Sequence, residues 1–209
     1  MGRNRSAVLE LAVLGLLRET PMHGYELRKQ ITSVLGLFRV LSYGSLYPCL
    51  HELQAAGLIA EDHDETARTD AAGSSPARLS GTAKPRGSGR RSLKVYRLTA
   101  DGKERLAELL GQGGPAAWED DGFGVHFAFF GQTRADVRLR ILEGRRSRLE
   151  ERMEGIRAAL TRTRERVDSY TLELHRHGLE SVEREVRWLN ELIASERQSG
   201  GHDNISEKE

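Results

Sequence analysis

The chain has 209 residues, enough for one ordinary domain together with a smaller or extended one. Its 32 basic and 31 acidic residues nearly cancel, so net charge alone indicates no nucleic-acid partner and only local clusters are informative. A hydrophobic content of 38% with 30% charged residues is low for a compact enzyme and favours helices with narrow apolar seams. The single cysteine excludes an internal disulfide and a cysteine-based zinc site.

The first apolar run, residues 7–17, contains Glu10 and is too short to span a bilayer, and no small-residue cleavage site follows it. We therefore expect a cytoplasmic protein with no membrane partner. The run is apolar on most sides, which predicts a core helix over residues 6–19. After a break at residues 20–22, a second helix is predicted over residues 23–35, with four residues directed inward: Tyr25, Leu27, Ile31 and Val34.

The third predicted helix, residues 42–57, has one apolar face and one small, polar face. Leu46, Leu50 and Leu53 recur at i, i+4 and i+7 and so share one stripe. Ser42 or Ser45 can cap its start, and Gly57 supplies a left-handed stop. The opposite face has no lysine or arginine and consists of Gly44, Ser45, Tyr47, Pro48, His51 and Glu52. Three short helices in this order predict a helix-turn-helix whose third helix approaches DNA closely.

A wing is predicted directly after these helices. Residues 58–59 lead towards a strand, and residues 93–99 alternate between apolar and polar side chains. Between them, residues 60–92 form a long loop that begins acidic and becomes basic and glycine-rich, and we expect it to be disordered at its tip. Its basic residues nearest the second strand, Arg90, Arg91 and Lys94, are expected to attract DNA phosphates.

A fourth helix is predicted over residues 99–110, and the glycines and proline of residues 111–115 mark a domain boundary. The following aromatic-rich linker, residues 113–130, has two interpretations. Its aromatic side chains either pack the winged helix against the C-terminal helices or line a pocket for a small molecule at the domain junction. The candidate effector-binding residues are Trp118, Phe123, His126, Phe127, Phe130 and Trp188.

Residues 131–199 are predicted to form a helical dimerisation domain. From Ala135 to Leu174 apolar residues alternate at spacings of four and three, as in a heptad repeat. A break at His177-Gly178 and a second seam after it predict an antiparallel helical hairpin. Such a hairpin is too long to bury both seams on itself, which predicts a two-fold dimer. The expected dimerisation residues are Leu142, Leu149, Met153, Ile156, Leu160 and Leu189.

Two further expectations concern the charged residues of this region. Charged residues are dense beside the apolar seam, and a solvated helix face explains them. These residues are Arg145, Arg148, Glu150, Glu151 and Arg152. The polar tail, residues 200–209, is predicted to be disordered.

No metal, cofactor or catalytic site is expected. His23 and Glu26 are spaced i, i+3, but a helix start with Tyr25 in the core explains them better than a metal pair. Cys49 lies in the third helix without an activating base, which disfavours a redox switch. Because the sequence shows no glycine-rich phosphate loop, nucleophile–base arrangement or paired carboxylates in a cleft, we expect no enzyme.

Several of these stretches together resemble the PadR family of transcriptional regulators, winged-helix proteins related to the MarR repressors. The similarity covers residues 6–110 and rests on Leu14-Gly15-Leu16-Leu17, Pro21-Met22-His23-Gly24-Tyr25-Glu26-Leu27, Gly44-Ser45-Leu46-Tyr47-Pro48-Cys49-Leu50, Leu53, Gly57-Leu58-Ile59 and Tyr96-Arg97-Leu98-Thr99-Ala100-Asp101-Gly102. In that family a C-terminal helical dimer presents two winged helices, and several members lose DNA affinity on binding a small aromatic or drug-like molecule. The long wing loop departs from the family pattern, by an insertion of roughly twenty residues.

The sequence thus predicts a mainly α protein, with a winged helix-turn-helix of three helices and a two-stranded wing (residues 1–112) and a C-terminal antiparallel helical hairpin. The expected function is a homodimeric repressor that binds a palindromic operator in double-stranded DNA and is released by a small-molecule effector. The alternatives are a coiled-coil protein-protein interaction module and a nucleotide-sensing regulator that uses the basic wing loop. The predicted DNA-binding residues are Ser42, Tyr43, Gly44, Ser45, Tyr47, Pro48, His51, Arg90, Arg91 and Lys94.

Overall fold

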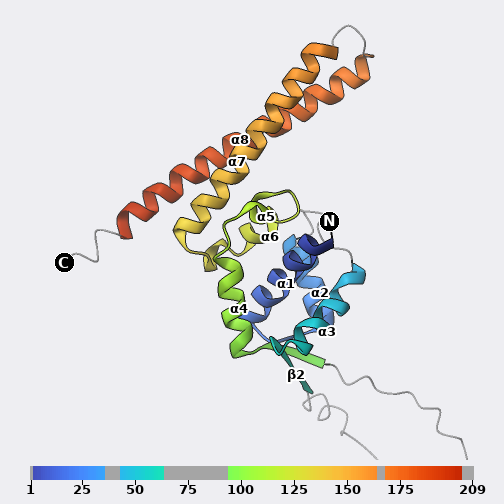
Figure 1. Cartoon of the computed structure of the whole chain (residues 1–209), viewed down its shortest axis with the longest axis vertical. Coiled ribbons are helices and arrows are strands. Elements are labelled where there is room, and N and C mark those ends of the chain that lie inside the picture. The colour runs from blue at the N-terminus through green and yellow to red at the C-terminus, as the bar shows by residue number, and fades with distance from the viewer. Residues whose placement is uncertain (1, 36–42, 64–93, 164–167, 204–209) are drawn as a thin grey trace, which may run out of the picture.

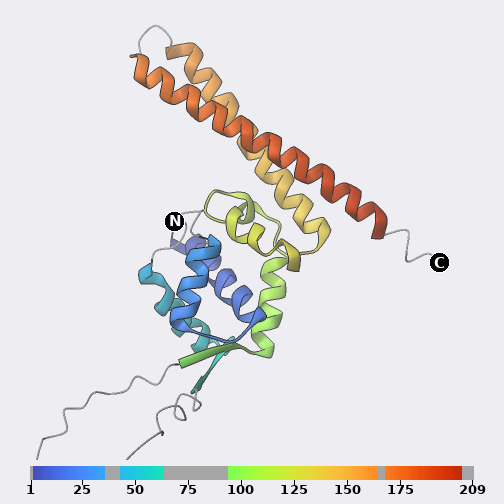
Figure 2. The same cartoon turned by 180° about the vertical axis from the view of Figure 1, so that it is seen from behind.

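The computed structural model describes residues 2–35, 43–63, 94–163 and 168–203. It has an N-terminal part of helices and a small sheet, and two long helices that form a C-terminal hairpin (Figure 1). A short helical segment lies between these parts, as the view from behind also shows (Figure 2). The predicted fold class, a mainly α winged helix-turn-helix followed by a helical hairpin, is confirmed.

The N-terminal part is built around α1 (Gly2–Glu19). This helix packs against α2 (Gly24–Leu35), α3 (Leu46–Ala55) and α4 (Ala100–Leu110). Residues 11–17 are all buried, which explains why the helix is apolar on nearly every side. An ion pair of 2.8 Å between Arg105 Nε and Glu10 Oε1 joins α4 to α1 at the edge of this core.

The sheet has three antiparallel strands in the order β1-β3-β2. Strands β2 (Ile59–His63) and β3 (Lys94–Leu98) are the predicted wing strands, and they pair from Ile59 with Leu98 to His63 with Lys94. Strand β1 (Met22–His23) was not predicted, because two residues are too few to show an alternating pattern. Residues 60–63, which we assigned to the wing loop, belong to β2, and residues 64–93 lie outside the described residues.

Local contacts fix the wing strands beside α3 and α4. Gly57 has a φ of +74°, so it turns the chain from α3 into β2 as predicted. Thr99 is the N-cap of α4: its hydroxyl accepts a hydrogen bond of 3.0 Å from the Gly102 N–H and donates one of 2.9 Å to the Leu58 carbonyl. Gly102 lies so close to the Leu58 carbonyl that a Cβ there would clash with it.

The segment predicted as a linker is helical and packed on both sides. It consists of α5 (Pro115–Trp118), α6 (Phe123–Ala128) and the 3-10 turn η4 (Phe130–Gln132). Phe129 is buried in the N-terminal core, where its ring lies against Gly15 of α1. Trp118 lies against Gly144 of the hairpin. The segment therefore contacts each part of the molecule through an aromatic ring that lies against a glycine: Phe129 contacts the N-terminal part and Trp118 contacts the hairpin.

The hairpin consists of α7 (Ala135–Thr163) and α8 (Ser169–Asp203). The predicted break at His177-Gly178 is wrong, because α8 continues through both residues. Asp168 starts α8 instead: its Oδ1 accepts hydrogen bonds from the backbone N–H groups of Tyr170 and Thr171 at 2.9 and 3.0 Å. A single glycine within a helix costs only about 1 kcal/mol relative to alanine, too little to end it.

Two other expectations for the hairpin are corrected. Arg145 was assigned to a solvated face but is buried, and its side chain is 9% exposed. Helix α8 extends through residues 200–203, the first part of the predicted tail, and residues 204–209 lie outside the described residues.

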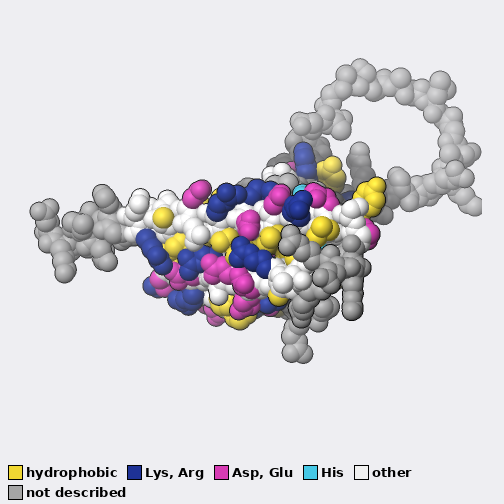
Figure 3. All heavy atoms as spheres, turned by 90° about the horizontal axis from the view of Figure 1, so that it is seen from above, with side chains coloured by type: hydrophobic (Ala, Val, Ile, Leu, Met, Phe, Trp, Pro, Cys, Tyr) yellow, Lys and Arg dark blue, Asp and Glu magenta, His cyan; other side chains and the backbone are white. Residues whose placement is uncertain are grey.

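On the face seen from above in Figure 3, basic and acidic side chains are interspersed, in keeping with ion pairs such as Arg157–Glu183. No described helix is long and apolar enough to cross a membrane.

Candidate nucleic-acid interface

Helix α3 presents the predicted small, polar face to solvent. Its three leucines and Cys49 are buried against the N-terminal core, as the spacing of the leucines predicted. The residues of the opposite face are exposed, and they are Gly44, Ser45, Tyr47, Pro48 and His51. Ser45 occupies the N-cap position, but its side chain makes no capping hydrogen bond. Ser42 lies outside the described residues, and of Tyr43 only the backbone is described, in the 3-10 turn η2 (Tyr43–Ser45).

The start of α2 lies beside this face. Tyr47 is 52% exposed, and its ring and that of Tyr96 both lie beside Gly24, where a Cβ would be 3.5 Å from each ring. The prediction that Tyr25 is in the core is wrong, because it is 69% exposed. Among the described side chains of α2, Leu27 and Ile31 are buried as predicted, and Gly24 takes the buried position expected for Tyr25. The side chain of Val34 lies outside the described part of the chain.

The carboxylate of Glu26 accepts a hydrogen bond of 2.9 Å from the backbone N–H of His23. This is the pairing of a helix N-terminus, in which an acidic side chain in the first turn satisfies a free backbone donor. It accounts for the i, i+3 spacing of the two residues in the sequence and agrees with the helix-start interpretation.

The wing strands carry paired rather than isolated charges. Lys94 Nζ lies 2.9 Å from Glu61 Oε1, and Arg97 Nε lies 2.7 Å from Asp62 Oδ2. The hydrogen bond to Glu61 raises the pKa of Lys94 above its ordinary value, so the ammonium stays charged at neutral pH. Arg90 and Arg91, the other predicted wing contacts, lie outside the described residues.

The thiol of Cys49 has low reactivity in this environment. Burial, with a smaller contribution from the carboxylates of Glu52 and Glu10, raises the pKa of its thiol to about 12. The thiolate, which is the reactive form, is therefore scarce at neutral pH.

Most of the candidate effector-binding residues meet at the junction of the two parts. The ring centroid of Phe127 lies 5.7 Å from Phe123, 4.9 Å from Phe130 and 5.3 Å from Trp188. His126 is also buried in α6, and burial lowers its pKa to about 4. Trp118 is not one of these ring contacts, since its indole lies against Gly144.

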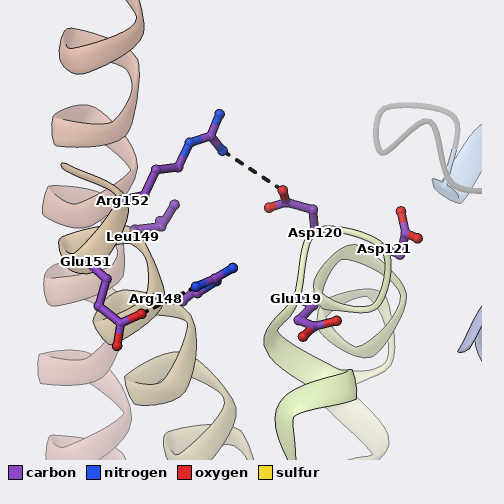
Figure 4. A pocket seen from close by; sticks show the side chains of 7 residues that line it. All are labelled: Glu119, Asp120, Asp121, Arg148, Leu149, Glu151 and Arg152. Atoms are coloured by element: carbon purple, nitrogen blue, oxygen red, sulfur yellow. Dashed lines mark hydrogen bonds and ion pairs between the residues drawn. The ribbon is translucent and has the colours of Figure 1, made fainter. Parts of the chain in front are cut away.

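Next to this cluster, Arg145 of α7 joins the helical segment to both hairpin helices. Its guanidinium contacts Asp120 Oδ1 at 2.6 Å and Glu185 Oε1 at 2.9 Å, and it lies 5.2 Å from the centre of the Phe123 ring. The hydrogen bond from Arg145 lowers the pKa of Asp120. Asp120 and Arg152 also line a pocket of about 720 Å³, and their nearest charged atoms are 3.9 Å apart (Figure 4).

Comparison with known proteins assigns the N-terminal part. A model of the Transcriptional regulator PadR-like family matches residues 13–72, which include α2, α3 and β2. This part of the chain is similar to the PadR-like family. The resemblance to this family identified from the sequence is confirmed. No curated protein matches this chain significantly.

Solved structures also resemble it. PadR of Bacillus subtilis in complex with operator DNA is 20% identical, with coverage of 90% of this chain and 99% of that chain and a TM-score of 0.37. The same protein in complex with p-coumaric acid is 20% identical, with coverage of 91% and 99% and a TM-score of 0.38. The PadR-like regulator BC1756 from Bacillus cereus is 16% identical, with coverage of 91% and 99% and a TM-score of 0.37.

Sequence reasoning missed three features of this chain. Glu61 and Asp62 were counted as loop residues because the sequence after Ile59 does not alternate between apolar and polar side chains, and only the pairing with β3 places them on β2. Tyr25 was placed in the core, although the face defined by Leu27 and Ile31 includes Gly24 and leaves Tyr25 outside it. Arg145 was interpreted as one of many surface charges, and nothing in its sequence surroundings marks it as buried.

Proposed function

We propose that this PadR-like regulator is a homodimeric repressor that binds a palindromic operator and releases it when a small molecule binds. The observation that carries the proposal is the outward face of α3, where small and hydrogen-bonding residues lie exposed beside the wing strands. A helix of this kind, flanked by a wing, is suited to the major groove of DNA.

Helix α3 supplies the principal contacts to DNA. The turn at Gly44 and Ser45 is exposed and its side chains are small, so a phosphate can approach the backbone N–H groups of the helix N-terminus. Tyr47 and His51 offer donors and acceptors that reach base edges or the DNA backbone. Because this face of α3 has no arginine for a bidentate contact to guanine, selectivity depends largely on DNA shape and half-site spacing.

The hairpin joins two copies of the chain. Its fully buried apolar residues, such as Leu142, Leu149 and Leu189, pack within one chain. Towards the distal end Met153, Ile156 and Leu160 are only partly buried, and Tyr170 and Leu174 are 86% and 67% exposed. A second hairpin related by a two-fold axis would cover these residues, and the axis would give the operator its symmetry.

The effector acts at the junction. The aromatic cluster of Phe123, Phe127, Phe130 and Trp188 lies where α6 meets the hairpin, so a planar molecule inserted there would shift one part against the other. The first probe is p-coumaric acid, which the Bacillus subtilis protein binds. We expect it to release DNA from the wild type, whereas Phe127→Ala keeps DNA binding and loses this response.

The test of DNA binding is a fluorescence-anisotropy titration against the DNA upstream of the chain's own gene, at two salt concentrations. We expect a Kd on the order of 10 nM that weakens steeply as salt rises, because bound phosphates release counterions. The double variant Tyr47→Ala, His51→Ala should lose at least about tenfold in affinity, since two groups that face the groove are removed.

Lys103→Gln is the matched control, because it removes an exposed cation from α4, on the far side of α1 from α3. It should retain nearly full operator binding. If the wild type binds no DNA selectively although it is dimeric, this operator is wrong or the winged helix binds protein instead. A screen of genomic fragments then decides between these two outcomes.

A further inference from the structure

We propose that Glu61 and Asp62 limit the non-specific, phosphate-driven binding of DNA by occupying the two described cations of the wing strands, Lys94 and Arg97. The inference rests on the proposed DNA-binding function and concerns how strongly the wing contributes to it. A regulator must find its operator among a large excess of other sites, so weak non-specific binding is an advantage.

The first pair lies on the side of the wing that faces α3. Glu61 is directly opposite Tyr96 across the β2–β3 ladder, and Lys94 is two residues along the same face. Lys94 Nζ lies 2.9 Å from Glu61 Oε1, and the Glu61 side chain is only 10% exposed while that of Lys94 is 51% exposed. The carboxylate is thus held in the structure, and the ammonium lies above it near solvent.

Helix α3 holds Glu61 in this position. Gln54 Nε2 of α3 donates a hydrogen bond of 3.3 Å to Glu61 Oε2, so the carboxylate accepts from both α3 and β3. The hydrogen bond from Gln54 keeps the carboxylate in place when Lys94 is drawn towards a phosphate. Lys94 must therefore leave an oriented partner to contact DNA, and that loss opposes the contact.

The second pair lies on the opposite face of the same strands. Arg97 Nε lies 2.7 Å from Asp62 Oδ2, with side chains 50% and 60% exposed. Both pairs are diagonal across the ladder and both consist of one acidic residue of β2 and one basic residue of β3. The described wing strands therefore contribute two cations whose charges are already compensated.

Because both ion pairs are partly exposed to solvent, each contributes only modestly to an equilibrium. Exposed ion pairs alter an equilibrium by up to about fivefold each. Each additional phosphate neutralised by a freed cation steepens the dependence of log Kd on log salt by about 0.9. A gain in affinity together with a steeper salt slope identifies a freed cation. A change in net charge far from the interface would produce neither.

The experiment measures binding of the full chain to its operator fragment and to a scrambled duplex over a range of salt concentrations. We expect Glu61→Gln and Asp62→Asn each to raise affinity for the scrambled duplex about three- to fivefold and to steepen the salt slope by about 0.9. Glu61→Gln keeps the size of the side chain and an acceptor for Gln54. The exposed Asp62→Asn provides a second test if Glu61→Gln does not fold.

Glu183→Gln is the matched control. Glu183 is paired with Arg157 at 3.0 Å in the hairpin, so its substitution removes the same charge and the same kind of pair away from the wing. It should leave both the affinity and the salt slope unchanged. Thermal melts of each variant verify that the fold is retained.

Combining Glu61→Gln with Lys94→Gln distinguishes a freed cation from the loss of simple repulsion between Glu61 and DNA. If Lys94 has been freed, Lys94→Gln cancels the gain, whereas its effect in the wild-type background is small. A gain that survives Lys94→Gln overturns the inference, as do unchanged affinity and slope in a chain that binds its operator. Failure of the wild type to bind any DNA at low salt overturns the proposed function itself.

Discussion

His126 of α6 is a buried base whose Nδ1 atom has no hydrogen-bond partner among the described residues. Helix α6 packs against α1 and α2, so this imidazole lies where the helical segment meets the winged helix. Desolvation disfavours the charged form and lowers its pKa from 6.5 to about 4. The fold therefore tolerates neutral His126 and opposes its protonation.

This predicts a loss of stability in mild acid. Above pH 6.5 neither the folded nor the unfolded chain binds the proton, so His126 adds no pH dependence. Between pH 6.5 and about 4 the unfolded chain binds it and the folded chain does not, so the free energy of unfolding falls by about 1.4 kcal/mol per pH unit. Urea unfolding at pH 6.5 and pH 5 should show about 2 kcal/mol greater loss for the wild type than for His126→Leu.

His51→Gln is the control for this measurement, because His51 is exposed on α3. The unfolding free energy of His51→Gln should fall as the pH is lowered, by as much as that of the wild type. If His126→Leu shows the same pH dependence as the wild type, the imidazole is accessible to water and the argument from burial is wrong.

At the scale of single elements, the sequence predicted helices and strands wherever apolar spacing alone decided them. The leucines of α3 and the core helix α1 are examples. Predictions that depended on contacts distant in sequence were less successful. The break in the hairpin is set by Asp168 rather than by Gly178, since a cap determines where a helix starts and one glycine does not end it.

The contact between Phe129 and Gly15 was invisible in the sequence for the same reason. A Cβ at position 15 would lie 2.5 Å from Cε1 and Cζ of the Phe129 ring, so Gly15→Ala forces the ring out of its place in the core. We expect a loss of about 1–3 kcal/mol in the free energy of unfolding, measured by urea titration. Gly15→Ala with Phe129→Leu should regain part of it, because the smaller side chain makes room.

Gly155→Ala is the matched control for this substitution. Gly155 lies within α7, and a Cβ added there would meet nothing within 4 Å, so alanine should stabilise the helix by up to about 1 kcal/mol. Equal effects of Gly15→Ala and Gly155→Ala would show that the Phe129 ring moves aside freely. The helical segment would then be attached to α1 less firmly than its burial indicates.

For the whole molecule, the order of the parts followed from composition and periodicity, but their contacts did not. The aromatic residues of positions 113–130 were noticed in the sequence, yet only the structure divides them between the winged helix, reached by Phe129, and the hairpin, reached by Trp118. The heptad seam was also a single pattern in the sequence. In the structure its proximal residues are buried within one chain, whereas its distal residues are partly exposed.

This division predicts where the proposed dimer can be weakened without unfolding the chain. Tyr170 and Leu174 are exposed on α8, so Tyr170→Ser with Leu174→Ser removes apolar surface that only a partner would bury. Sedimentation equilibrium should show at least about tenfold weaker self-association with an unchanged melting temperature of the monomer. Arg176→Ser, on the opposite side of α8, is the control and should dimerise normally. Operator binding by the double variant should become dependent on protein concentration, since two separate monomers must then occupy the two half-sites. Unchanged self-association would place the interface elsewhere on the chain.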